Sequence, residues 1–217
     1  FLYLMNYFSL FAGQEGDPAN PFVLGHLWSL AVEEHFYLVF PLLFVLLFRR
    51  PRAFVLVLVG ICLAAIGVRA IAFGVFDNPD YAYFASDARI DSIIFGCLLA
   101  LAMRHAVGQR ILYRFGRSPV LVAALALMLA TLLYRDEAFR DVLRFTVQGI
   151  ALFFGVAALY TSALGAFVVM VLEVGVLRFL GRISYGMYLW HFLPGRAVFL
   201  IAGVDPDTGA LITMVFC

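Results

Sequence analysis

The sequence predicts an all-α protein, a polytopic bundle of transmembrane helices. Of its 217 residues, 65% are hydrophobic and only 13% are charged, whereas a soluble domain is nearer half apolar and a quarter charged. The mean hydropathy is +1.00. Apolar runs long enough to cross a bilayer recur along the chain, separated by short segments rich in Gly, Pro or charge. The net charge of +1 argues against a nucleic-acid partner.

The apolar runs, taken in order, predict a single transmembrane domain that covers residues 1–217 and is truncated at both ends. Predicted loops rich in Gly, Pro, Asn or charge separate these runs, among them 77–87, 104–118 and 135–141. An apolar stretch at 163–180, broken by glycines and Glu173, is expected to be re-entrant or interfacial. The predicted spans are about 1–11, 26–48, 53–76, 88–103, 119–134, 142–162, 183–203 and 210–217.

Arginine asymmetry predicts the orientation of these spans. The segments 49–52, 104–118 and 178–182 carry three, four and two Arg, and they lie on one side if the spans alternate. Three segments on the opposite side carry none, although residues 135–144 carry three. Because cytoplasmic loops are enriched in basic residues, the Arg-rich side is predicted to be cytoplasmic.

The stretch HLWSLAVEEHFYLVFP (26–41) places two carboxylates inside an apolar run. A charge at the centre of a transmembrane helix costs roughly 2.5–3.5 kcal/mol, so such residues normally face the bundle interior or a wet cavity. Helical spacing puts His26, Glu33 and Tyr37 on one face, with Ser29 at its border. This face is therefore predicted to line an internal cavity.

Two alternatives apply to this stretch. Glu33 or Glu34 would be structural if it formed an ion pair with Arg69 or Arg89 on another helix. Trp28 points away from the predicted cavity face, and it would serve as an interfacial anchor rather than as a sugar-stacking ring.

A second polar patch lies in ASDARIDSIIFG (85–96). Arg89 and Asp91 stand at the predicted outer mouth of a span, where Arg89 could bind a phosphate or carboxylate. The alternative is structural: Arg89 would extend to the interface, and Asp91 would be a favourable carboxylate at a helix start.

A third patch lies in LGRISYGMYLWHF (180–192). Ser184, Tyr185, Tyr188 and His191 follow one another at helical steps, and His191 lies well inside the predicted span. The alternative is a packing face of small residues next to an aromatic belt. We expect the three patches to converge near the middle of the membrane.

These three stretches resemble the signature segments of the acyltransferase 3 family. HLWSLAVEEHFYLVFPLL resembles H-x-W-S-L-x-V-E-x-x-F-Y, ARIDSIIFGCLLA resembles R-x-D-x-L-x-x-G-x-L-L-A, and LGRISYGMYLWHF is similar to L-G-x-I-S-Y-x-L-Y-L-W-H. The departures are His35 in place of Gln, and Ile93 and Met187 in place of Leu.

The resemblance implies a bacterial inner-membrane O-acyltransferase. Its donor would be cytoplasmic acyl-CoA, most often acetyl-CoA, used as a co-substrate without a further cofactor. Its acceptor would be a hydroxyl of a cell-surface or exported carbohydrate, or of a lipid-linked one. The family's best-supported catalytic histidine and its arginine motif would precede Phe1, so we expect the chain to be inactive alone.

Acyl transfer to a hydroxyl needs a base and a group that stabilises the oxyanion. We predict that Glu33 and His26 are catalytic, with Glu33 orienting a histidine or binding the acceptor. No metal site is predicted, since no two histidines share a helix turn and the cysteines fit no zinc motif. The predicted substrate-binding residues are Trp28, Ser29, Tyr37, Arg89, Asp91, Ser184, Tyr185, Tyr188 and His191.

Two other function classes fit the composition. Intramembrane Glu, Arg and His are also typical of proton-coupled transporters, although such proteins favour internal repeats and none is visible here. A purely structural membrane subunit would tolerate neutral substitution of Glu33.

Overall fold

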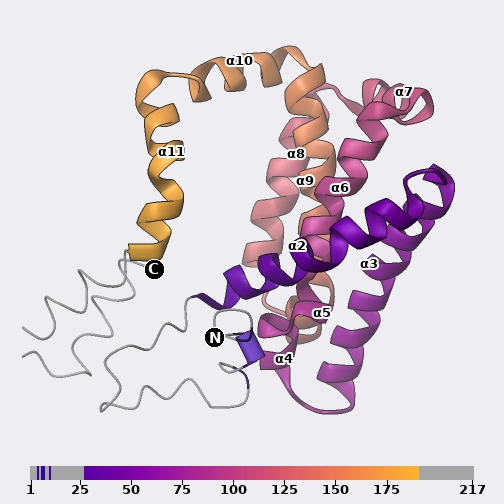
Figure 1. The fold of residues 1–217 in the computed structure, drawn as a ribbon. Coiled ribbons are helices and arrows are strands. Elements are labelled where there is room, and N and C mark those ends of the chain that lie inside the picture. The colour runs from indigo at the N-terminus through magenta and orange to yellow at the C-terminus, as the bar shows by residue number, and fades with distance from the viewer. Residues whose placement is uncertain (1–3, 5, 8–9, 11–26, 191–217) are drawn as a thin grey trace, which may run out of the picture. The chain divides into compact units, whose positions relative to one another are not determined.

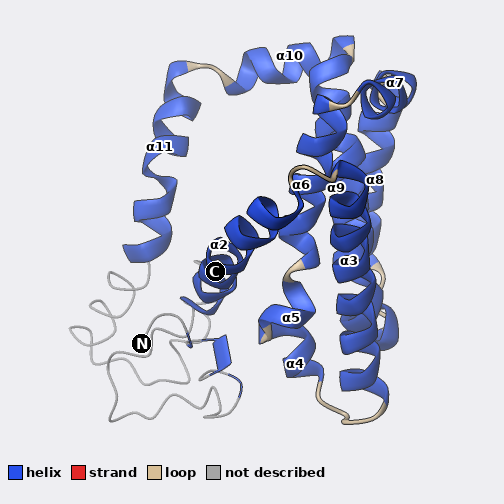
Figure 2. Cartoon of the chain, turned by 45° about the vertical axis from the view of Figure 1, so that its right-hand side comes forward, coloured by secondary structure: helices blue, strands red, loops and turns tan. Residues whose placement is uncertain are grey.

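The structure is a computed structural model that describes residues 4, 6–7, 10 and 27–190. In these residues every regular element is a helix, which confirms the predicted all-α class (Figure 1 and Figure 2). The chain divides into two units, Phe1–Val168 and Val169–Cys217.

The first unit opens with two long apolar helices, α2 (Trp28–Leu47) and α3 (Pro51–Gly74). Proline stands in the first turn of α3, where its missing N–H leaves no hydrogen bond unmade. Phe54 and Leu58 of α3 are fully buried and pack with Ile94 of α6 in the core. Both helices lie within 2 residues of the spans expected for them.

Two short helices, α4 (Pro79–Phe84) and α5 (Ser86–Arg89), form the segment that the sequence predicts as a loop. The side chain of Asn78 caps α4 by accepting a hydrogen bond from the Tyr81 N–H at 3.1 Å. The chain then enters α6 (Asp91–Arg104). These short helices hold aromatic and polar side chains beside the end of α3.

The segment 104–118 was predicted as a loop, and this prediction is wrong. The chain bends by 107° after α6 into a further helix, α7 (Ala106–Phe115). Val107, Ile111 and Phe115 recur every fourth residue, so α7 is amphipathic although it carries arginines. Charge density suggested a loop, but the helical period determined the structure.

A central helix organises the first unit. It is α9 (Arg144–Thr161), which packs against α6, α7 and α8 (Ser118–Leu133) and runs beside α8 in Figure 1. Small residues allow these helices to approach closely. A methyl group at Gly149, for example, would stand 2.2 Å from the Phe95 ring of α6.

The start of α9 is preceded by a π-helical turn, η3 (Phe139–Leu143), in place of part of the charged loop predicted at 135–141. The Arg144 N–H bonds to the Phe139 carbonyl, five residues back. Continuous with α9, this turn completes a helix of 23 residues that is apolar enough to cross a membrane.

The chain continues through α10 (Ala163–Leu172) to α11 (Gly175–Trp190), with a bend of 72° between them. The described part of the second unit consists of the end of α10 and α11. α11 begins at Gly175, eight residues before the expected start of the 183–203 span. The rest of that span, and the one predicted at 210–217, lie outside the described residues.

Three helices in the described residues are long and apolar enough to cross a membrane: α2, α3 and the continuous Phe139–Thr161 helix. The number rises to five if each of the two bent pairs forms one span. α8 is apolar but shorter, at 16 residues. The chain is thus a multi-pass membrane protein built of helices.

Candidate active site

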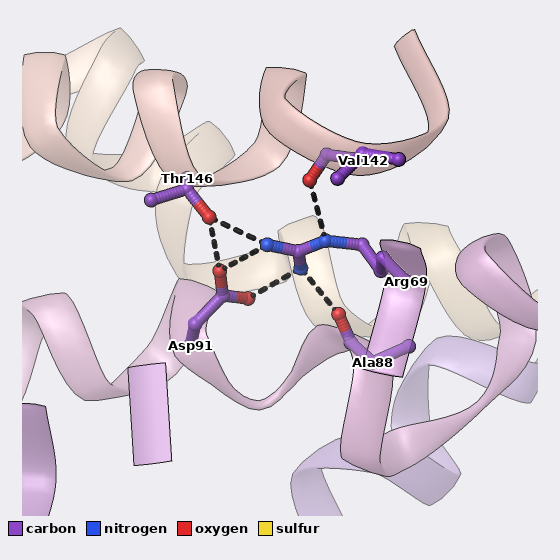
Figure 3. Close-up of polar contacts among 5 residues, drawn as sticks. All are labelled: Arg69, Ala88, Asp91, Val142 and Thr146. Carbon is purple, nitrogen blue, oxygen red and sulfur yellow. Dashed lines mark hydrogen bonds and ion pairs between the residues drawn. The ribbon is translucent and has the colours of Figure 1, made fainter. Parts of the chain in front are cut away.

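A buried ion pair joins three long helices of the first unit. Arg69 of α3 and Asp91 of α6 are both 0% exposed, with 2.9 Å between Nη2 and Oδ2 (Figure 3). A second hydrogen bond of 3.1 Å joins Nη1 to Oδ1. Thr146 of α9 donates to Asp91 Oδ2 at 2.7 Å and accepts from Arg69 Nη2 at 2.5 Å. The pair is bidentate, which is the strongest geometry for such contacts.

The remaining guanidinium hydrogens of Arg69 bond to backbone carbonyls. Nε donates to the Val142 carbonyl at 2.8 Å, and Nη1 donates to the Ala88 carbonyl. Arginine has five N–H bonds, and all five have partners here. The structural alternative in which Glu33 or Glu34 forms an ion pair with Arg69 is therefore wrong.

Asp91 lies in the first turn of α6, as expected from the structural alternative of a carboxylate at a helix start. Its carboxylate accepts from Arg69 and Thr146 and is fully buried. This geometry makes Asp91 a structural anchor. Its role in substrate binding stays a prediction.

Arg89 lies in a different environment, among aromatic rings. Its guanidinium carbon stands 3.7 Å from the Phe145 ring centre and 5.6 Å from those of Trp28 and Tyr83. The Nη1 atom is buried and has no hydrogen-bond partner among the residues that the structure describes. Arg144 approaches the same Phe145 ring at 4.8 Å. The structure thus brings together two predicted residues, Trp28 and Arg89, and adds three that sequence reasoning missed.

Trp28 packs tightly in this cluster. Its ring centre lies 4.8 Å from that of Tyr83 and 5.2 Å from that of Phe84. We define the aromatic cluster as Trp28, Tyr83, Phe84 and Phe145. It surrounds a charged guanidinium that retains an unused N–H, which is the property expected of a ligand-binding arginine.

A polar network borders the cluster. His35 Nδ1 and Ser86 Oγ are hydrogen-bonded at 2.6 Å, and Asn6 Nδ2 donates to the same hydroxyl at 2.9 Å. Glu34 Oε2 is buried without a hydrogen-bond partner. None of these residues was a predicted site residue. The signal for His35 was its position seven residues after Trp28, which places both on one helix face.

The face of α2 that was predicted to line a cavity is exposed. Glu33 is exposed and Tyr37 is 64% exposed, whereas Ala31 and Phe36 are buried. Among the described residues α2 thus buries its Trp28–His35 side, and the cavity-lining role of the Glu33 face stays a prediction. The catalytic role of Glu33 stays a prediction. Ser29, at the border of the two faces, is half-buried.

The third predicted patch lies on α11 in the second unit. Ser184 donates its hydroxyl to the Gly181 carbonyl of its own helix at 2.8 Å, and Tyr185 is 64% exposed. Tyr188 is half-buried. His26 and His191 lie outside the described residues. The convergence of the three patches and the roles of these residues stay predictions.

The described residues contain no group of three or more His, Cys, Asp or Glu side chains that could hold a metal ion.

Comparison with known proteins identifies the family of the chain. A family profile described as an acyltransferase domain, that of acyltransferase 3, matches residues 1–215. The chain belongs to the acyltransferase 3 family. The predicted membership of this family is thereby confirmed.

Several curated relatives of this family member are O-acetyltransferases by name. The O-acetyltransferase OatA of Staphylococcus aureus is 28% identical over 193 residues, which are 84% of this chain and 32% of the relative. The putative peptidoglycan O-acetyltransferase YrhL of Bacillus subtilis is 29% identical over 80% of this chain and 28% of its own length. The peptidoglycan O-acetyltransferase OatA of Listeria monocytogenes is 26% identical, over 79% and 29%.

The chain thus spans about a third of the length of these relatives. No solved structure matches it.

Proposed function

We propose that the protein is a membrane O-acyltransferase that moves an acyl group, most simply acetyl, from acyl-CoA to a hydroxyl of a cell-surface carbohydrate. Membership of the acyltransferase 3 family supports the reaction class, and the names of the relatives support an acetyl group and a peptidoglycan-like acceptor. The structural observation that carries the proposal is the unpaired N–H of Arg89 within the aromatic cluster.

The acyl transfer requires a group that stabilises negative charge. The acceptor oxygen attacks the thioester carbonyl, a base takes the hydroxyl proton, the new C–O bond forms, and the C–S bond breaks to release the CoA thiol. Charge builds on the carbonyl oxygen during the attack, and a preorganised N–H donor stabilises it. Arg89 offers such a donor, because its Nη1 has no protein partner to give up.

The surroundings of Arg89 suit both substrates. The buried rings of Phe84 and Phe145 limit access of water, so a charge-assisted hydrogen bond from the guanidinium is stronger there than in solvent. Trp28 and Tyr83 provide ring faces with polar tips, which are typical of sugar contacts. We therefore assign Arg89 to the reacting carbonyl, or to a phosphate or carboxylate of a substrate.

The other predicted roles belong to the same proposal. Glu33 and His26 are candidates for acid–base chemistry, and Ser184, Tyr188 and His191 for acceptor contacts. The Arg-rich segments 49–52, 104–118 and 178–182 would be cytoplasmic, in a bacterial inner membrane, so that acyl-CoA enters from that side.

The test uses the full-length protein in detergent with acetyl-CoA as donor, and it follows both thiol release and acetyl transfer to a glycan. Arg89→Met should lower kcat/KM by about 100-fold or more, roughly 2.7 kcal/mol of transition-state stabilisation, at unchanged folding. Arg135→Met is the matched control, because Arg135 is exposed and outside the aromatic cluster. Its activity should stay within about twofold of wild type.

Each outcome decides something. If wild type releases no thiol from acetyl-CoA or from longer acyl-CoA, the acyltransferase proposal fails. If wild type is active and folded Arg89→Met retains full activity, Arg89 is not the oxyanion or anion group. Glu33→Gln is measured in parallel, since a catalytic Glu33 requires a similar loss and an exposed bystander requires none.

A further inference from the structure

A polar cavity of about 410 Å³ lies where the end of α3, helix α4 and the start of α9 meet. Its volume falls within the roughly 300–1,000 Å³ that is usual for small-molecule sites. Its charged and aromatic lining comes from three separate parts of the first unit and includes Asp77, Asp80, Tyr83, Arg140, Asp141 and Arg144.

The charge of the cavity lining limits the classes of ligand that the cavity can bind. With Glu137, the lining holds four carboxylates and two guanidinium groups, a formal charge of −2. Such a lining repels phosphate and carboxylate groups. The cavity is therefore unsuited to the phosphorylated acyl-CoA donor and to acidic sugars.

The same lining is suited to hydroxyl groups. Carboxylates such as Asp80 and Asp141 accept hydrogen bonds from hydroxyls, while Arg140 and Arg144 donate to hydroxyl and ring oxygens. The buried Nε of Arg144 has no hydrogen-bond partner. Tyr83 is 43% exposed and presents a ring face against which the apolar side of a sugar can stack.

The cavity also adjoins the proposed reacting group. Tyr83 and Phe145 line it, and both rings stand next to the Arg89 guanidinium. A ligand in the cavity thus lies against the same two rings as the Arg89 guanidinium. The π-helical turn η3 supplies Arg140 and Asp141 to the lining, and π-helical turns occur frequently at functional sites.

We infer that this cavity is the acceptor subsite and that it selects a neutral, hydroxyl-bearing sugar unit over an acidic one. The inference rests on the proposed function, which requires a carbohydrate acceptor. It adds the location of the acceptor and the requirement that the acceptor be uncharged. The two carboxylates Asp80 and Asp141 determine the selectivity, and Tyr83 supplies the stacking surface.

The experiment uses the full-length protein, with a neutral N-acetylglucosamine tetramer and an acidic galacturonate tetramer as probes. Thiol release from acetyl-CoA in the absence of a tetramer, with water taking the acetyl group, is measured separately from acetyl transfer to each tetramer. The double variant Asp80→Asn/Asp141→Asn should raise KM for the neutral tetramer about tenfold, equivalent to 1.4 kcal/mol of binding. Its preference for the neutral over the acidic tetramer should fall by a similar factor.

Asp136→Asn is the matched control. It removes one charge close by, yet Asp136 does not line the cavity, and Asn retains the oxygen that caps the Phe139 N–H. This variant should keep the wild-type KM and selectivity. If the double variant does not fold, Glu137→Gln replaces it, because Glu137 is an exposed lining residue whose substitution leaves the core intact.

Three results would overturn the inference. One is an unchanged KM for the neutral tetramer in the folded cavity variant. The second is equal use of both tetramers by wild type. The third result concerns the case in which wild type releases no thiol, so that the proposed function has failed. Binding of the neutral tetramer is then measured by titration calorimetry, and the inference is overturned if no binding depends on Asp80 and Asp141. Binding that does depend on them would keep the subsite and reject the reaction.

Discussion

Replacing Asp91 with Asn tests the energetics of the buried ion pair. The substitution leaves the Arg69 charge in place, fully buried, and turns an amide NH2 group toward its donors. Two hydrogen bonds from Arg69, at 2.9 and 3.1 Å, and one from Thr146, at 2.7 Å, lose their anionic acceptor. Breaking a buried pair from one side typically costs 3–5 kcal/mol, and we expect about that loss here.

Removing both charges should be far less harmful. In Arg69→Met/Asp91→Leu no charge remains to be desolvated, and such replacements are often neutral or stabilising by roughly 1–4 kcal/mol. Thr146 can then turn its hydroxyl to the Val142 carbonyl, four residues earlier on the same helix. We expect the double variant to lie within about 1.5 kcal/mol of wild type, or above it.

The assay is thermal unfolding of the full-length protein in detergent, followed by tryptophan fluorescence and by activity. For a domain of this size each kcal/mol shifts Tm by roughly 2–4 °C, so Asp91→Asn should lower Tm by about 6–20 °C. A single variant within about 1 kcal/mol of wild type would refute the reasoning. So would a double variant as unstable as the single one.

The remaining predictions concern packing and pH. Gly149→Ala should destabilise by about 1–3 kcal/mol because its methyl group would collide with the Phe95 ring; Gly60→Ala, with nothing within 4 Å, should be neutral or slightly stabilising in the same unfolding assay. Burial, together with the hydrogen bond to Asp87 and its charge, raises the pKa of Tyr81 from 10.0 to about 12. The folded state thus favours the neutral phenol, whose stabilisation is full below pH 10 and is lost as pH rises through 12. The stability difference between wild type and Tyr81→Phe, from unfolding at a series of pH values, should be constant to pH 9 and then shrink; a difference unchanged at pH 12 would contradict this.

Hydropathy predicts the positions of the long helices well, because segments that lie in lipid are apolar in composition. The ends of α3 and α8 fall within a few residues of their predicted limits. At α7 the local charge density predicts a loop, whereas the helical spacing of its apolar residues determines a helix. The π-helical turn at 139–143 had no sequence signal, since a single extra residue per turn changes no pattern of polarity.

The site was less predictable because α2 is apolar on every side. Hydropathy does not choose a face, so the carboxylate of Glu33 alone indicates the interior side, whereas among the described residues Glu33 is exposed. Packing instead buries the face of Trp28, Ala31 and His35, at helical steps of three and four. The partner of Arg69 lies 22 residues away, and no local pattern encodes such a pairing.

The buried arginine has a consequence for how the protein is made. Helix α3 leaves the ribosome before Asp91 and Thr146, so it must enter the bilayer while Arg69 still lacks its counter-ion. An arginine at the centre of a helix opposes insertion by roughly 2.5–3.5 kcal/mol. The twelve Leu, Ile, Val and Phe residues of α3 favour insertion by about 4–7 kcal/mol in total. The apolar excess of α3 is thus enough to hold an unpaired arginine in the membrane until the later helices arrive.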